Sequence, residues 1–233
     1  MATVNRRPSA GAFTKAAAPR RRGLMKERAY TELKRLILSE AVEPGAFLSE
    51  RQLAARLKMS KTPIKAALER LEAERFISVS PQQGIVVQDL TLEEIADDFE
   101  IREALETYVV RRMAGKLNEE QVGRMRANLA EQRATVDAVD VATNARLDSE
   151  FHLLWCEFFG NREILDAMRR LRDRIHRIIA RVNARNSARL LESYEEHARI
   201  AEAVFAGDGE AAARSIEEHL NYGKQCLLTP RPR

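Results

Sequence analysis

Disulfide bonds and membrane spans are not expected in this chain, because cysteines are few and long apolar runs are lacking. The 233 residues include two cysteines, Cys156 and Cys226, which cannot build a disulfide framework. No apolar stretch approaches the ~20 residues that cross a bilayer, and the N-terminus lacks the compact apolar segment of a secretory signal. We therefore expect a protein of the reducing cytoplasm with no membrane partner.

Aromatic residues are also few, at 6% of the chain, and Ala, Leu, Arg and Glu dominate, a composition that favours helix. The 45% hydrophobic and 32% charged residues are ordinary for a globular protein, and the length allows one large domain or two small ones. Neither an internal repeat nor the H-E-x-x-H motif of zinc peptidases is present. The composition predicts a mainly helical globular protein.

The net charge of +4 is unevenly divided along the chain. Residues 1–90 hold 17 Lys and Arg against 9 Asp and Glu, whereas residues 91–233 hold 22 against 26. The front of the chain is therefore basic and the rear mildly acidic. A polyanion such as nucleic acid is expected to meet only the front.

The basic front is expected to begin with a tail and three helices. Residues 1–23 are rich in Ala, Arg, Pro and Gly without an apolar period, which predicts a disordered tail. Residues 24–40 fit a first helix, and Ser49 and Ser60 stand where the caps of a second and a third helix belong. Two short helices joined by a tight turn form a helix-turn-helix unit.

The period of the apolar residues changes after residue 75. Two β-branched runs, 76–80 and 85–87, flank Pro81-Gln82-Gln83-Gly84, a pattern typical of a hairpin. Helix, helix-turn-helix and hairpin together predict a winged helix over residues 24–88, in which the hairpin tip is the wing.

The start of the third helix combines features that attract phosphate. Ser60 is expected to cap it with its hydroxyl, and Pro63 suits a first turn because an N–H there has no helical partner. Lys61 and Lys65 oppose the helix macrodipole, and a polyanion at this end would reverse that cost. The alternative is a basic helix start that is only solvated.

Several motifs of this region stand at continuous spacing: Pro44-Gly45, Leu53-Ala54, Ser60 to Leu68, Leu71-Glu72, and Gly84 with Val86-Val87. With them, residues 24–88 resemble the N-terminal domain of the GntR family of bacterial transcription regulators. The resemblance implies a homodimer that binds a pseudo-palindromic double-stranded operator, and so associates with the nucleoid. It implies DNA contacts from Arg51, Ser60, Lys61, Thr62, Lys65 and Gly84.

This sequence departs from the usual family pattern at the recognition helix. The pattern has Arg at positions 61 and 65 and an acidic residue at 66, where this chain has Lys61, Lys65 and Ala66. Lysine lacks the two-pronged donor set that arginine offers to guanine. We therefore expect DNA binding with a different operator sequence.

Every segment from residue 91 to residue 227 has helical periodicity. Caps and stops divide it into six expected helices, at 91–115, 118–134, 139–159, 161–184, 187–206 and 208–227. Six helices are enough for a compact bundle with an enclosed core. The predicted fold is therefore mainly α, with a winged helix-turn-helix and its small hairpin followed by an all-α bundle.

Four side chains of the predicted bundle are candidate metal ligands. Asp148 and His152 lie four residues apart and share a helical face, while His197 and His219 lie within two later helices. If the bundle brings them together, three imidazoles and a carboxylate suit a divalent ion such as Zn, Ni, Co or Mn. The alternative is three ordinary polar histidines and a surface aspartate, because no short motif links the positions.

Further motifs of the bundle are Asp148-Ser149-Glu150-Phe151-His152, Gly160-Asn161, Glu196-His197 and Gly207-Asp208. Together they resemble the FadR C-terminal effector domain (FCD), the ligand-binding half of one GntR branch. Six helices match its shorter VanR-type variant. The resemblance implies a divalent metal, zinc first, held by Asp148, His152, His197 and His219.

The same resemblance implies that Arg102 faces the pocket, where it would clamp the carboxylate of a small metabolite. The alternative is an exposed Arg102 paired with Glu106 at i+4. His176 matches no ligand position and is expected to be an ordinary surface or packing residue, and Cys156 is expected to be a buried packing residue.

Together these features predict a metabolite-responsive transcription regulator, expected to be a repressor and not an enzyme. Two other classes stay open. A metal-dependent enzyme would use the Asp/His group and would show robust turnover of small acids or esters. An architectural protein would bind operator and random DNA equally well, whereas specific binders typically prefer their site by ~10³–10⁷-fold.

Overall fold

The computed structural model describes residues 19–38, 41–80 and 84–228. The chain divides into two compact units, Met1–Leu36 with Ala46–Val87, and Ile37–Gly45 with Gln88–Arg233. Among the described residues, no helix is both long and apolar enough to cross a membrane. The predicted tail lies outside the described residues up to residue 18.

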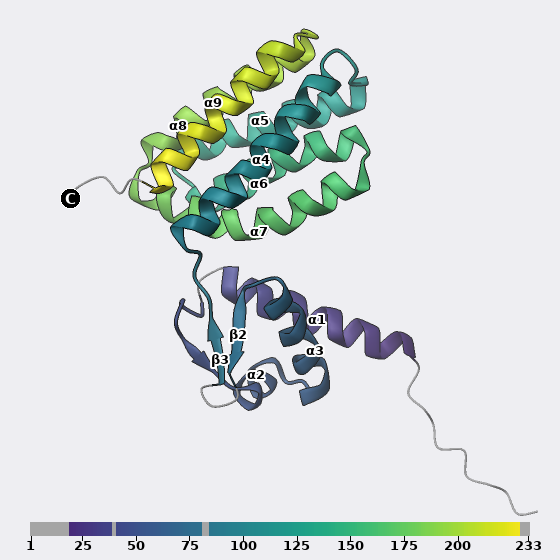
Figure 1. Ribbon diagram of the computed structural model, residues 1–233, viewed down its shortest axis with the longest axis vertical. Helices are drawn as coiled ribbons and strands as arrows, with labels where there is room; N and C mark the ends of the chain where they lie inside the picture. The colour runs from purple at the N-terminus through teal and green to yellow at the C-terminus, as the bar shows by residue number, and fades with distance from the viewer. Residues whose placement is uncertain (1–18, 39–40, 81–83, 229–233) are drawn as a thin grey trace, which may run out of the picture. The chain divides into compact units, whose positions relative to one another are not determined.

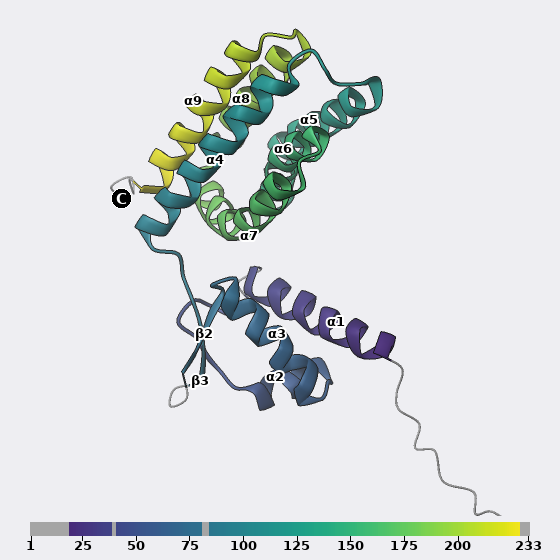
Figure 2. The same cartoon turned by 45° about the vertical axis from the view of Figure 1, so that its right-hand side comes forward.

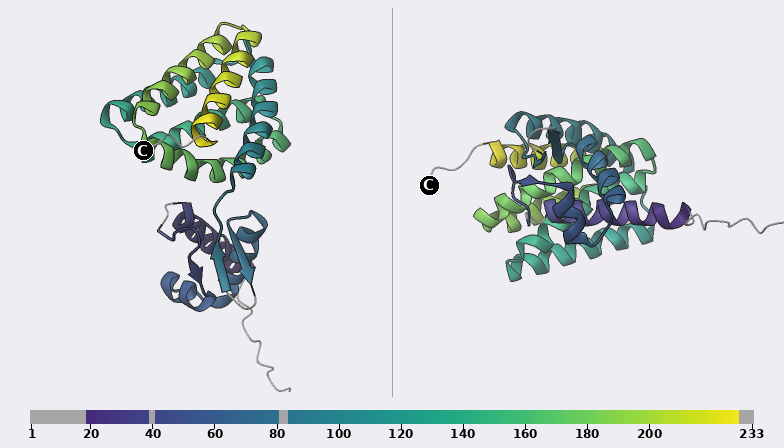
Figure 3. Two further views of the ribbon diagram at one scale, coloured as in Figure 1. Left: turned by 60° about the vertical axis from the view of Figure 1, so that its left-hand side comes forward. Right: turned by 90° about the horizontal axis from the view of Figure 1, so that it is seen from below.

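The first unit contains three helices and a small sheet (Figures 1 and 3). Its elements are α1 (Pro19–Leu38), β1 (Phe47–Leu48), α2 (Glu50–Leu57), α3 (Lys61–Ala73), β2 (Ile77–Ser80) and β3 (Gly84–Val87). The strands are antiparallel in the order β1-β3-β2, and Val86 of β3 lies opposite both Phe47 and Ser78. The predicted winged helix-turn-helix fold is thereby confirmed.

Two details of this unit differ from the sequence prediction. Helix α1 begins at Pro19 rather than at residue 24, since proline suits the first helical position and the arginines that follow are good helix formers. Strand β1 was not predicted, because two residues carry no measurable alternation.

Ser60 occupies the N-cap position of α3, but within the described chain its side chain makes no capping hydrogen bond. The reason is local. A capping hydroxyl usually accepts from the third helical N–H, and in α3 that residue is Pro63, which has none. Ser49, by contrast, caps α2 as predicted and forms a capping box with Gln52. The Ser60 hydroxyl therefore remains available to a ligand.

The second unit is an all-helical bundle, as predicted (Figure 2). Its helices are α4 (Leu92–Met113), α5 (Glu119–Ala138), α6 (Val141–Phe159), α7 (Arg162–Arg185), α8 (Ala188–Phe205) and α9 (Gly209–Leu228). Helix α4 packs against α9 and α6, and α5 packs against α6 and α8. Capping boxes at Thr91 and Asn118 start α4 and α5.

The bundle core is mainly apolar around Phe151, Trp155 and Ile200, but it also buries many polar groups. Buried Asp148, His152, His197 and His219 belong to α6, α8 and α9. Cys156 is fully buried among the apolar residues, and burial raises the pKa of its thiol. The interpretation of Cys156 as a packing residue is confirmed.

Candidate metal centre and nucleic-acid interface

The five predicted DNA-contacting side chains near the starts of α2 and α3 are all exposed: Arg51, Ser60, Lys61, Thr62 and Lys65. Within the part of the chain that the structure describes, none of them has an ion-pair or hydrogen-bond partner. The first turn of α3 also has no acidic residue. Two cations, two hydroxyls and the free N–H groups of a helix start are thus left open to an anion.

Gly84 has a backbone role that the sequence did not reveal. Its φ is +87°, and an added Cβ would lie 3.0 Å from the backbone oxygen of Leu48 in β1. Any other residue would be strained there and would press on the neighbouring strand. Gly84 therefore shapes the base of the wing, and a direct DNA contact from it stays a prediction.

The structure brings Asp148, His152, His197 and His219 together. Each offers one ligand atom, and the four atoms lie within 4.8 Å of one another. His219 Nε2 lies 3.2 Å from His152 Nε2 and 3.3 Å from His197 Nε2, while Asp148 Oδ1 lies 3.6 Å from His197 Nε2. Such a group can hold a metal ion.

The opposite ring nitrogen of each histidine is directed at an acceptor. His152 Nδ1 contacts Glu106 Oε2, and His219 Nδ1 lies 2.6 Å from Glu196 Oε2. His197 Nδ1 lies 2.8 Å from Gln132 Oε1. Because these oxygens accept, the three Nδ1 atoms carry the protons and the Nε2 atoms present lone pairs to the centre. This is the arrangement in which metal-binding histidines are usually oriented by outer hydrogen bonds.

The orientation of Gln132 is set by a chain of hydrogen bonds that ends on the backbone. The carbonyl of Leu147 accepts from Asn128 Nδ2 at 3.1 Å, so Asn128 Oδ1 is left to accept from Gln132 Nε2 at 2.7 Å. Gln132 Oε1 must then face His197. The tautomer of His197 is therefore fixed by a carbonyl that can only accept.

Two features of this centre fit a cation. Lone pairs of imidazole nitrogens 3.2–3.3 Å apart repel each other unless something positive lies between them. Ligand atoms about 2.1 Å from one ion would be roughly 3.0–3.4 Å apart at octahedral to tetrahedral angles. In addition, Asp148 Oδ2 is buried and has no hydrogen-bond partner among the described residues. A buried carboxylate oxygen left without a partner is costly, and a metal would satisfy it.

The environment of the centre favours the neutral form of its histidines, which is the form that binds a metal. Burial lowers the pKa of His197 well below its usual value, and it lowers the pKa of His219 although Glu196 opposes the shift. Burial also raises the pKa of Glu106, but Arg102 and His152 outweigh it and lower that pKa to about 2. Glu196 is held at a pKa of about 2 in the same way by His219 and Arg189. Neutral imidazoles beside ionised carboxylates are the forms that bind a metal.

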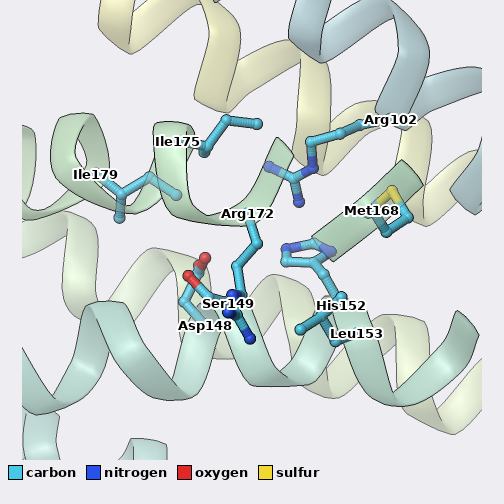
Figure 4. A pocket seen from close by; sticks show the side chains of 9 residues that line it. All are labelled: Arg102, Asp148, Ser149, His152, Leu153, Met168, Arg172, Ile175 and Ile179. Carbon is cyan, nitrogen blue, oxygen red and sulfur yellow. The ribbon is translucent and has the colours of Figure 1, made fainter. Parts of the chain in front are cut away.

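Arg102 lies beside this centre and is buried, so the interpretation of an exposed arginine is wrong. Its pairing with Glu106 was foreseen, and the Arg102 Nε to Glu106 Oε1 distance is 2.7 Å. Arg102 lines a cavity of about 20 Å³ together with Asp148, Ser149, His152 and Arg172 (Figure 4). That space holds about one water molecule.

Sequence reasoning missed the residues that orient the ligands. Glu106, Gln132 and Glu196 lie on α4, α5 and α8, and each supports a histidine on another helix. Of these three residues, only Glu196 stands in a motif that is visible in the sequence, Glu196-His197. His176, the remaining histidine, lies outside the group, and its Nδ1 is 3.3 Å from the carbonyl of Ala145.

Comparisons with known proteins agree with this architecture. The model of the bacterial regulatory proteins of the gntR family matches residues 25–87, and the FCD domain model matches residues 97–222. The chain is 31% identical over 173 residues to the gluconate operon transcriptional repressor of Bacillus licheniformis, covering 74% of this chain and 70% of that protein. It is 26% identical over 196 residues to the HTH-type transcriptional repressor RspR of Escherichia coli K12, covering 83% and 85%.

Solved structures show the same fold. Escherichia coli McbR/YncC matches with a TM-score of 0.76 and 23% identity over 87% of this chain and 96% of that chain. A GntR-type regulator from Rhodococcus sp. RHA1 matches with a TM-score of 0.77 and 21% identity over 88% and 99%. The two units therefore recur together, in this order, in other proteins.

Proposed function

The chain belongs to the gntR family of bacterial regulatory proteins, in the branch with an FCD domain, and we propose that a metal ion and a small carboxylate control its operator binding. Both would bind in the helical unit, and the winged helix would bind the operator. The protein is a DNA-binding transcription regulator and not an enzyme, since its relatives are named transcriptional regulators, among them the two repressors described above. The metal, the carboxylate and the dimer are our proposals.

The observation that carries the metal proposal is the convergence in the interior of three Nε2 lone pairs and the carboxylate of Asp148, whose Oδ2 has no partner among the described residues. Asp148, His152, His197 and His219 would hold the ion, with zinc as the first candidate for three imidazoles and one oxygen. When bound, the ion supplies a Lewis-acidic coordination point for a carboxylate. The protein orients the ligands, because Glu106, Gln132 and Glu196 hold the three imidazole rings in place.

Arg102 is proposed to bind the effector carboxylate. Glu106 holds its Nε, so the outer edge of the guanidinium faces the cavity that Asp148 and His152 also line. An effector can change DNA binding only if it favours one conformation of the protein over another. A cavity of about 20 Å³ is too small for a metabolite, so binding must move part of its wall.

The DNA contacts are proposed for Arg51, Ser60, Lys61, Thr62 and Lys65, with Gly84 at the wing. A homodimer would present two α3 helices to the two half-sites of a palindromic operator. Ile101 and Tyr108, seven residues apart on α4, are 46% and 47% exposed and offer an apolar surface for such a dimer. Repression relieved by the effector is the proposed mode, in a cytoplasmic protein that is bound at the nucleoid in its repressing state.

The proposed function is tested with an operator selected from random duplexes by the full-length, zinc-loaded protein. Fluorescence anisotropy against a scrambled duplex at the same salt concentration should show a preference of at least about 10³-fold. A carboxylate effector should then lower operator affinity only when zinc is present. Equal affinity for both duplexes would instead indicate an architectural DNA-binding protein.

Arg102→Lys should weaken carboxylate binding by about tenfold and leave the zinc content unchanged, because lysine keeps the charge beside Glu106 but loses the fork that fits a carboxylate. Calorimetry of the zinc-loaded variant and metal analysis measure the two effects separately. Arg102→Ala is a poorer test, since it leaves the fully buried Glu106 without its cation. Loss of zinc in Arg102→Lys would mean that Arg102 serves only the fold.

A further inference from the structure

We propose that the effector is a short dicarboxylate, bound at one end by Arg102 beside the metal ligands and at the other by Arg172 at the mouth of the same cavity. The inference rests on the proposed function, because it names the chemical class of the effector. It is carried by the position, the anchoring and the surroundings of Arg172, a residue for which the sequence gave no signal.

Arg102 and Arg172 reach the cavity from different helices, α4 and α7 (Figure 4). The Arg102 side chain is 5% exposed, whereas that of Arg172 is 41% exposed. One guanidinium therefore lies at the closed inner end of the site, and the other lies where the site meets solvent. A ligand with an acidic group at each end would meet both.

The two guanidiniums are anchored in the same way. Arg102 Nε donates to Glu106 Oε1 at 2.7 Å, and Arg172 Nε donates to Asp173 Oδ1 at 2.7 Å. Across the described residues, neither has a further hydrogen bond on its two Nη groups. An arginine held through Nε keeps a planar pair of donors for a ligand, and that pair matches a carboxylate. The anchors also explain how both cations are tolerated before a ligand binds.

The wall between the two arginines is mainly apolar. It is formed by Leu153, Met168, Ile175 and Ile179, and apart from the proposed metal ligand His152, Ser149 is the one uncharged polar side chain among the lining residues that the structure describes. A short methylene chain suits this wall, whereas the hydroxyls of a sugar acid would lose water without finding partners. The cavity is only about 20 Å³, so the ligand must displace part of the cavity wall. Helix α7 is the element expected to move, because its Arg172 is the most exposed charged residue that lines the cavity.

The test is calorimetric titration of the zinc-loaded, full-length protein with matched acids of equal carbon number. The pairs are succinate with butyrate, glutarate with pentanoate, and adipate with hexanoate. In at least one pair the dicarboxylate should bind about tenfold more tightly. Arg172→Gln should bring that ratio close to one while the monocarboxylate keeps its affinity. Arg169→Gln, a change on the exposed face of the same helix, is the matched control and should keep the ratio.

The outcomes separate this inference from the function on which it rests. Equal affinities in all three pairs, or a ratio that Arg172→Gln does not change, would overturn the dicarboxylate assignment and leave a monocarboxylate effector. If no acid of either kind binds although the protein holds zinc and selects an operator, the effector part of the proposed function fails, and the inference fails with it.

Discussion

Zinc is expected to raise the melting temperature of the wild-type protein by roughly 10 °C and to leave that of His197→Ala without a measurable change. A ligand that binds only the folded state at a thousand times its Kd adds about 4 kcal/mol to the free energy of unfolding. For a protein of this size, 1 kcal/mol corresponds to roughly 2–4 °C. His197 is fully buried, and its Nε2 faces those of two other histidines, so its removal should abolish most of the ion's affinity.

The readout is the difference between zinc and chelator for each variant, not the absolute melting temperature. His197→Ala also loses packing, since the His197 ring stacks on Phe151 with centroids 4.1 Å apart, and it leaves Gln132 Oε1 without its partner. That loss is the same with and without zinc. His176→Ala is the matched control, because His176 lies outside the group, and it should keep the full zinc effect. A zinc effect preserved in His197→Ala would show that the ion binds elsewhere.

Replacing both Lys61 and Lys65 with alanine should lower operator affinity by about 100-fold without destabilising the fold. A base contact is worth about 1–3 kcal/mol, and each lost phosphate contact should lower the salt slope of binding by about one. Both lysines are exposed at the start of α3, where positive charge opposes the helix macrodipole. Their removal should therefore leave the free energy of unfolding unchanged or slightly raise it.

The experiment is informative because operator affinity is expected to fall while the free energy of unfolding is not. Anisotropy with the selected operator measures the affinity at several salt concentrations, and urea unfolding measures the stability. Replacing both Lys116 and Arg199 with alanine removes two exposed cations outside the winged helix and is the charge-matched control. Operator affinity that falls as much in this control would mean that net charge, rather than the start of α3, governs binding.

Much of the fold could be predicted from the sequence because its signals are local. Ser49 caps α2 as expected, and Thr91 and Asn118 stand at the predicted starts of α4 and α5, where they form capping boxes. The helices of the bundle start and end within a few residues of their predicted bounds. The exceptions also have local causes, since Pro63 removes the donor that Ser60 would have capped, and a two-residue strand leaves no period to detect.

The candidate site could be predicted only in part. Spacing placed Asp148 and His152 on one face, but only the packing of α6, α8 and α9 shows that two later histidines reach the same point. The partners that orient the rings are distant in sequence: Glu106 is 46 residues from His152, and Gln132 is 65 residues from His197. No sequence period reports such a pair. The burial of Arg102 was likewise decided by its neighbours rather than by its own helix.

The central claim, a metal centre inside the regulator's helical unit, is tested most directly by the metal content of untagged protein. Mass spectrometry of wild type, His197→Ala and His176→Ala, each incubated with zinc and then freed of excess metal, gives the number of ions per chain. We expect about one ion in the wild type and in His176→Ala and none in His197→Ala. A wild type that retains no ion after incubation with zinc, nickel or manganese would contradict the account and leave the Asp148 and histidine group as a polar pocket.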